Sequence, residues 1–97
     1  MVVGVVQFRL FMPHNHSLKE KRKILNRLKD RVLSEQQIFV SEVGDPELWQ
    51  NAALGFAVVG NDQRVLESLI TRTMNFIVSM HLGEVSPEER DYLQYDL

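Results

Sequence analysis

The stretch that decides the fold is Ser17–Leu33, which reads SLKEKRKILNRLKDRVL. Ser17 and Glu20 have the spacing of a capping box, in which each side chain satisfies a free backbone N–H at the start of a helix. Apolar residues then recur at helical spacing and form one stripe: Leu18, Leu25, Leu28 and Val32, with Ile24 beside it. The stretch therefore predicts a capped amphipathic helix that packs on a core through this stripe.

The same helix carries most of the positive charge of a chain whose formal net charge is −2. Opposite the apolar stripe lies an outward row of four basic residues: Lys19, Arg22, Lys23 and Arg27. Lys21 falls on the apolar stripe, so we expect its stem to pack at the edge of the core and its ammonium to reach the surface. A row of cations that repel one another along a helix suits a surface that binds phosphates or an acidic protein, and it also occurs on helices that bind nothing there.

Working outward from this helix, the flanking segments read as strands. Val2–Met12 alternates apolar and mixed positions and stops at Pro13. Gln37–Val43 reads as a second strand, and Ala52–Val59 as a third in which large and small residues alternate. The large residues of the third strand are expected to face the helices.

The connection between the second and third strands carries a turn signal at Gly44-Asp45-Pro46. We expect Glu47–Asn51 to form a short helical turn, with Trp49 packed over the edge of the core, because a lone tryptophan in a small domain usually buries most of its area.

A second helix is predicted from the Asp62 cap to about His81, with Gly83 as its C-terminal cap. Its apolar stripe contains Leu66, Leu69, Thr73, Phe76, Ile77 and Met80. Residues from Val85 to Leu97 supply a final strand after Pro87.

The order β-α-β-β-α-β predicts an α+β fold of the ferredoxin-like type, with a four-stranded antiparallel sheet and both helices on one face. The 97 residues suit one domain, residues 1–97. The second face of the sheet is left open, and the first strand presents Val3, Val5, Arg9 and Phe11 on it. An apolar open face of this kind is a candidate interface.

Composition limits the chemistry that can be expected. The chain has no cysteine, hence no disulfide and no thiolate metal site. No secretory signal or membrane span is recognisable, so the expected location is the cytoplasm, without a membrane partner. His14 and His16 could join a metal site if a third ligand came close. No phosphate loop or nucleophile motif occurs, so we expect no enzyme and no cofactor.

Five segments resemble the YlxP-like family of small bacterial proteins of unknown function: His16–Arg22, Ser41–Val43, Leu48–Ala52, Leu54–Val59 and Asn61-Asp62. The resemblance implies a ferredoxin-like fold and brings no activity or catalytic residues. Members are often encoded beside translation-initiation and ribosome-maturation factors, which implies a role linked to RNA or the ribosome. The family's motif positions are occupied here by Ser17, Lys19, Lys21, Arg22 and Trp49.

Together these observations predict a non-enzymatic module that binds RNA or the ribosome through its first helix. The residues expected to contact phosphates are Lys19, Arg22, Lys23 and Arg27, with Lys21 at the rim. The alternative is a protein-interaction module that forms a homodimer or docks a partner through Val3, Val5, Arg9 and Phe11 on the open sheet face. A metal-dependent enzyme using His14 and His16 is the third hypothesis.

Overall fold

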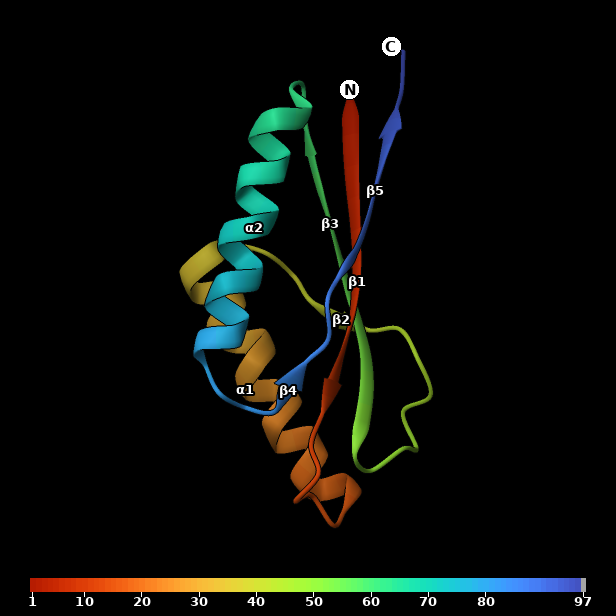
Figure 1. The fold of residues 1–97 in the computed structure, drawn as a ribbon, viewed down its shortest axis with the longest axis vertical. Helices are drawn as coiled ribbons and strands as arrows, with labels where there is room; N and C mark the ends of the chain where they lie inside the picture. Colours follow the sequence, from red (N-terminus) through yellow and green to blue (C-terminus); the bar gives the residue numbers. More distant parts are fainter. Residues whose placement is uncertain (97) are drawn as a thin grey trace.

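A computed structural model of the chain describes residues 1–96 and contains seven elements (Figure 1). They follow one another as β1 (Val2–Phe11), α1 (Leu18–Gln36), β2 (Ser41–Glu42), β3 (Asn51–Gly60), α2 (Gln63–Ser79), β4 (Glu84–Val85) and β5 (Glu89–Gln94). Both helices cover the same side of the sheet, to the left in Figure 1, and the other side carries no helix. This is the predicted ferredoxin-like α+β fold.

The sheet is antiparallel and has the strand order β2-β3-β1-β4, with β5 also paired to β1. The predicted fourth strand is thus present in two pieces on the same edge of β1. Ser86 lies between the pieces and replaces a rung of the ladder, since its N–H donates to the Arg9 carbonyl and its hydroxyl accepts from the Arg9 N–H, both at 2.9 Å. The predicted end of this strand at Leu97 lies outside the described residues.

The first helix begins at the predicted cap Ser17, but the Glu20 carboxylate reaches the N–H of His16 and not that of Ser17, so half of the predicted capping box forms. The Ser17 hydroxyl accepts from the Glu20 N–H at 3.1 Å, and the Glu20 carboxylate accepts from the His16 N–H at 3.2 Å. Leu25, Leu28 and Val32 are buried against the sheet. The core between helices and sheet is completed by residues such as Phe8, Leu10, Leu54, Ile70 and Ile77. The prediction that the large residues of β3 face this core is confirmed, because Leu54, Phe56 and Val58 are all buried in it.

The ends of two elements differ from the prediction. Gln37 does not begin a strand; it caps α1 in the left-handed conformation (φ 57°), and its N–H donates to the Leu33 carbonyl. Gly83 does not cap α2, which ends at Ser79, and the residue with positive φ is His81 (φ 52°). Gly83 is instead required for close packing, because a Cβ there would lie 2.5 Å from the Phe11 carbonyl oxygen.

The buried face of α2 is rotated relative to the predicted stripe. It consists of Leu66, Ile70, Thr73, Met74 and Ile77. The predicted Leu69, Phe76 and Met80 are only half-buried. The helix also meets α1, where the Arg31 guanidinium lies 5.8 Å from the centre of the Phe76 ring. A single apolar stripe in the sequence therefore combined residues that face the sheet with residues that lie toward the neighbouring helix.

Candidate functional site

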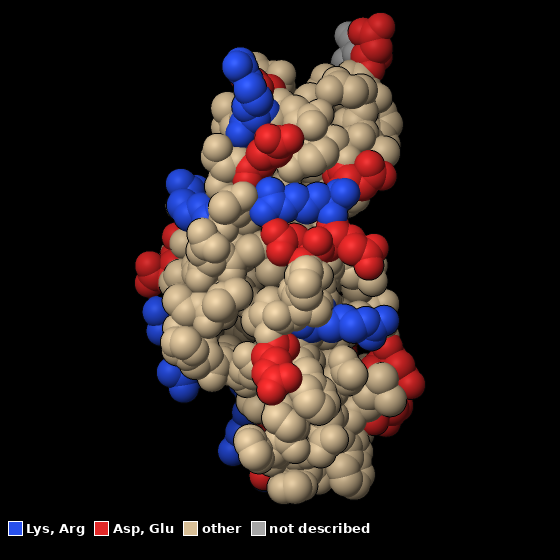
Figure 2. Space-filling view, in the orientation of Figure 1, with Lys and Arg blue, Asp and Glu red and all other residues tan. Residues whose placement is uncertain are grey.

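The outward row of α1 is exposed as predicted. Lys19, Arg22, Lys23 and Arg27 are exposed, and within residues 1–96 none of them forms an ion pair. In Figure 2 the basic side chains over α1 appear spaced along the left edge of the molecule, on the helical side. The row is therefore available to a partner.

Lys21 does not lie at the rim of this row, so its prediction as a nucleic-acid contact is wrong. The residue is 1 % exposed. Its ammonium lies 2.8 Å from the Glu42 carboxylate and donates to the backbone carbonyls of Leu48 at 2.6 Å and Pro46 at 3.3 Å. A buried ammonium must be paired and hydrogen-bonded, and these three contacts turn the side chain inward instead of letting it reach solvent.

Lys21 belongs to a network that fixes the loop from Val43 to Gln50. The Asn15 amide donates to the carbonyls of Ser17 and Trp49, and the Gln50 amide donates to the carbonyls of Pro13 and Asn15. These bonds join the start of α1, the segment after β1 and the β2–β3 loop. Sequence reasoning missed this role of Asn15 and of Gln50, because both act between segments that are distant along the chain.

The loop held by this network contains no helical turn at Glu47–Asn51, contrary to the prediction. Trp49 is 54 % exposed, so the expectation that it packs over the core is also wrong. Its backbone carbonyl is held by Asn15, while its ring is left largely in solvent. The neighbouring Leu48 is exposed as well. The network therefore fixes the backbone of a loop that presents two large apolar side chains.

The sheet face opposite the helices carries the second predicted surface. Val3 and Val5 are half-buried, and Arg9 and Phe11 are exposed. Val3 is flanked by Val59 on β3 and by Leu93 on β5. The structure thus brings all four predicted interface residues to one face, which follows from the strict alternation of side chains along β1.

The open sheet face carries more apolar side chains than predicted, because exposed residues before and after β2 extend it. Phe39 alternates with the buried Ile38 and Val40 and is 76 % exposed. Val43 continues the alternation, and its methyl groups lie 3.5 and 3.6 Å from where a Cβ of Gly55 would be. Alternation could have identified Phe39 and Val43, since both follow the period of two that Ile38 and Val40 set.

The open sheet face also carries both signs of charge. Asp91 and Glu89 on β5 pair in register with Val5 and Gln7 of β1, and Arg9 lies two residues further along β1. All three charged residues are exposed. Acidic side chains therefore gather at the β5 edge of the face, and a cation lies nearer its centre.

One carboxylate has a shifted pKa. Glu88 accepts from the Arg90 guanidinium at 2.7 Å, and this hydrogen bond lowers the pKa of Glu88 below its usual 4.5, aided by the backbone. The same bond raises the pKa of Arg90. Arg90 also donates to the Glu67 carbonyl and to the Thr71 hydroxyl. The pair therefore joins β5 to α2 and lies outside the predicted surfaces.

The histidines of the metal hypothesis do not gain a third ligand. Across residues 1–96, no three histidine, aspartate or glutamate side chains lie close enough together to hold a metal ion. His14 lines a cleft, and His16 is exposed with its backbone bonded to Glu20.

Neither helix of the described chain has the length and apolar character that crossing a membrane requires.

Comparison with solved structures places the fold among ferredoxin-like proteins. A dimeric ferredoxin-like protein from an uncultured marine organism superposes with a TM-score of 0.50 and 9 % identity, covering 100 % of this chain and 92 % of that protein. A de novo designed protein, Foldit4, superposes with a TM-score of 0.54 and 15 % identity, covering 98 % of each chain. At such low identity, the likeness concerns the fold alone.

Comparison of sequences identifies the family. The family described as "Protein of unknown function (DUF503)" matches residues 3–90. The uncharacterized protein YlxP of Bacillus subtilis (strain 168) is 31 % identical over 78 residues, which cover 80 % of this chain and 85 % of that protein. The motif residues that suggested the resemblance thus belong to a match along most of the chain, and the protein is a member of the YlxP-like DUF503 family.

Proposed function

We propose that this chain is a non-enzymatic interaction module that forms a homodimer through the open sheet face. The observation that carries the proposal is the row formed by Val59, Val3 and Leu93 on a face that no helix covers. Val59 is 62 % exposed, and Phe39 and Val43 add further apolar area on the β2 side. A contiguous exposed apolar patch of this kind marks an interaction site.

A second copy of the chain suits this face because of its charges. In a two-fold dimer the same face meets itself, so it must be complementary to its own image. Arg9 and the acidic pair Glu89 and Asp91 supply both signs, and a second copy offers each charge an opposite one. The ferredoxin-like protein described above is dimeric, which is consistent with the proposal.

Sedimentation equilibrium with two matched variants tests the proposal. Val59 on β3 and Val65 on α2 are both 62 % exposed. The variants Val59→Asp and Val65→Asp therefore place a carboxylate at equally exposed positions of the monomer. We expect the wild type and Val65→Asp to form dimers. We expect Val59→Asp to raise the dimer dissociation constant about a hundredfold, since it places a carboxylate inside the interface. A wild type that stays monomeric at about 1 mM, or equal dimerisation of the two variants, would contradict the proposal.

The exposed cationic row of α1 favours a second candidate function, binding of RNA. Lys19, Arg22, Lys23 and Arg27 form no ion pair within residues 1–96, so their charges are available to phosphates. Phosphate contacts release counterions, and binding then weakens as salt rises. Lys21 takes no part in this candidate.

Titration of a structured RNA at several salt concentrations tests this candidate. Lys23→Glu with Arg27→Glu is expected to weaken binding and to reduce the salt slope by about two, one unit for each lost contact. The control, Arg64→Glu with Arg72→Glu, reverses two exposed charges on α2 and should leave binding nearly unchanged. Equal effects of the two double variants would show that the row on α1 is not the binding surface.

A further inference from the structure

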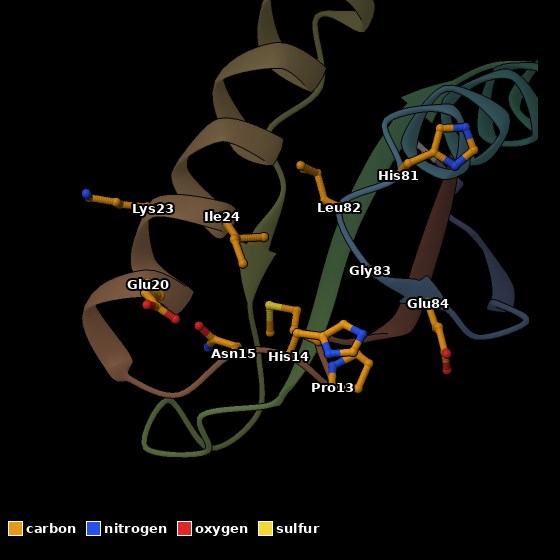
Figure 3. A pocket seen from close by; sticks show the side chains of 11 residues that line it. Pro13, His14, Asn15, Glu20, Lys23, Ile24, His81, Leu82, Gly83 and Glu84 are labelled. Carbon is orange, nitrogen blue, oxygen red and sulfur yellow. The ribbon is translucent and has the colours of Figure 1, made fainter.

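A cleft lies at the end of the molecule where α1 begins, between the segment after β1 and the segment that links α2 to β4 (Figure 3). Its volume is about 610 Å³, within the range of clefts that hold small molecules. Met12, Ile24 and Leu82 give it an apolar lining. Polar groups come from His14, Asn15 and Glu20. This cleft is separate from the open sheet face, and Lys23 is the lining residue that it shares with the outward row of α1.

Asn15 supplies the observation that points to a ligand. The residue is 4 % exposed, and within residues 1–96 its side-chain oxygen Oδ1 has no hydrogen-bond partner. The orientation of the amide is fixed, because Nδ2 donates to the carbonyls of Ser17 and Trp49. Exchanging the two amide atoms would put an oxygen against two carbonyl oxygens. Oδ1 is therefore a buried acceptor that lacks a donor, and such an atom favours a bound N–H or O–H group.

The charges around the cleft decide which donor fits. Figure 3 shows the Glu20 carboxylate and the Asn15 oxygen lying toward each other at one side of the cleft. The Lys23 ammonium points away from the cleft, on the far side of α1, and the Glu84 carboxylate points away at the opposite end. The start of a helix ordinarily favours an anion. Here the Glu20 carboxylate already occupies that position by accepting from the His16 N–H.

We propose that the cleft binds a small organic amine, whose ammonium donates to Asn15 Oδ1 and to the Glu20 carboxylate while its apolar body lies against Met12, Ile24 and Leu82. A protonated amine matches the site in three respects: it carries only donors, its charge is opposite to that of Glu20, and it can bear an apolar group. This inference does not depend on dimer formation or on RNA binding, because it uses neither surface.

Titration of the labelled full chain by two-dimensional NMR tests the proposal. The probe is phenethylamine hydrochloride, and phenylacetate serves as an anion of similar shape. We expect saturable shifts of the Asn15 side-chain amide and of the Ile24 and Leu82 backbone signals, with a dissociation constant on the order of 1 mM. Phenylacetate is expected to bind at least about tenfold more weakly. Equal or tighter binding of phenylacetate would overturn the proposal. The absence of a saturable shift at the cleft would also overturn it, and water would then be the partner of Asn15 Oδ1.

A conservative pair of variants separates binding from folding. Glu20→Gln keeps the capping acceptor for the His16 N–H and removes the charge, so the fold should persist while phenethylamine binds about tenfold more weakly. Glu35→Gln removes the same charge from an exposed position on the same helix, outside the cleft, and should bind as the wild type does. Unchanged affinity in Glu20→Gln would contradict the proposal. Asn15 itself is unsuitable as the test position, since its amide also holds the Trp49 loop.

Discussion

Burial of a lysine is unfavourable unless its ammonium is fully paired, and Lys21 meets this requirement through Glu42, Pro46 and Leu48. The side chains of Lys21 and Glu42 are 2 % and 17 % exposed, so solvent screens their attraction far less than it would on the surface. In a protein of this size, such a residue links the first helix to a loop more than twenty positions away. We conclude that Lys21 has a structural role.

Replacement of Lys21 by methionine should therefore destabilise the protein strongly. Lys21→Met leaves the Glu42 carboxylate partly buried without its partner and leaves the Leu48 carbonyl without its donor. We expect the free energy of unfolding to fall by about 3 kcal/mol, measured by urea denaturation. The control Lys23→Met removes an exposed lysine from the same helix and should change stability by less than about 0.5 kcal/mol.

A double variant shows whether the loss comes from the orphaned charge. Lys21→Met with Glu42→Leu removes both charges, so it should recover part of the stability lost in the single variant. If Lys21→Met alone were as stable as Lys23→Met, the ion pair would not have the structural role assigned to it.

For Lys21, the sequence predicted what local spacing determines and no more. The helical period correctly placed Lys21 on the apolar stripe. It could not reveal that Glu42 and two loop carbonyls come within reach of the ammonium, because those groups are brought there by the β2–β3 connection. Trp49 was mispredicted for the same reason. A tryptophan in a small domain is usually buried, whereas contacts from distant segments fix the backbone of Trp49 here and leave its side chain exposed.

Among the elements, β5 is joined to the helical layer by the Arg90 side chain, beside the partly buried Tyr92 that packs on the core. Arg90 reaches from β5 to the Glu67 carbonyl and the Thr71 hydroxyl of α2, and Glu88 holds the guanidinium from the other side. Only six residues form β5, and it lies at the edge of the sheet. The pair therefore stabilises the last strand of the fold.

The stability of this link should depend on pH. The hydrogen bond from Arg90 lowers the folded-state pKa of Glu88 below 4.5, so the ionised carboxylate stabilises the folded state above that pH. This contribution is lost as the pH falls through the lowered folded-state pKa. Because the pair is partly exposed, we expect it to be worth less than about 1 kcal/mol at pH 7. Thermal or urea unfolding of Glu88→Gln should show this difference from the wild type at pH 7, and it should vanish in acid.

The variant Glu84→Gln serves as the control, since it removes an exposed carboxylate from the neighbouring strand β4. Its difference from the wild type should change little over the same pH range. A Glu88→Gln difference that grew in acid would have the wrong sign for a lowered pKa and would refute the role of Arg90.

The elements themselves were largely predictable, and their ends were less so. The first and third strands and both helices follow from hydrophobic periodicity and from the Ser17 and Asp62 caps. Gln37 and His81 adopt positive φ although neither is glycine, so the usual end signals gave the wrong positions. The prediction that Gly83 caps α2 is wrong, and glycine is required there because β1 approaches closely. Such ends are decided by packing between segments.

At the scale of the whole molecule, the fold leaves one face of the sheet open, and this face is the proposed dimer interface. The order of the elements predicts that both helices cover one side of the sheet, and the structure agrees. The alternation along β1 then predicts which side chains lie on the other side. The alternation along the third strand likewise predicts Val59 on this face, but the sequence could not reveal the register that brings Val59 and Leu93 to the two sides of Val3.

The most direct test of the homodimer is a measurement of contacts between copies. Equal amounts of isotope-labelled and unlabelled chain are mixed, and nuclear Overhauser effects are recorded only between labelled and unlabelled molecules. We predict intermolecular contacts among the methyl groups of Val3, Val59 and Leu93, with none from the exposed Val65 on α2. Contacts between copies confined to α1 or α2, or their absence at concentrations where the chain is fully associated, would contradict the account.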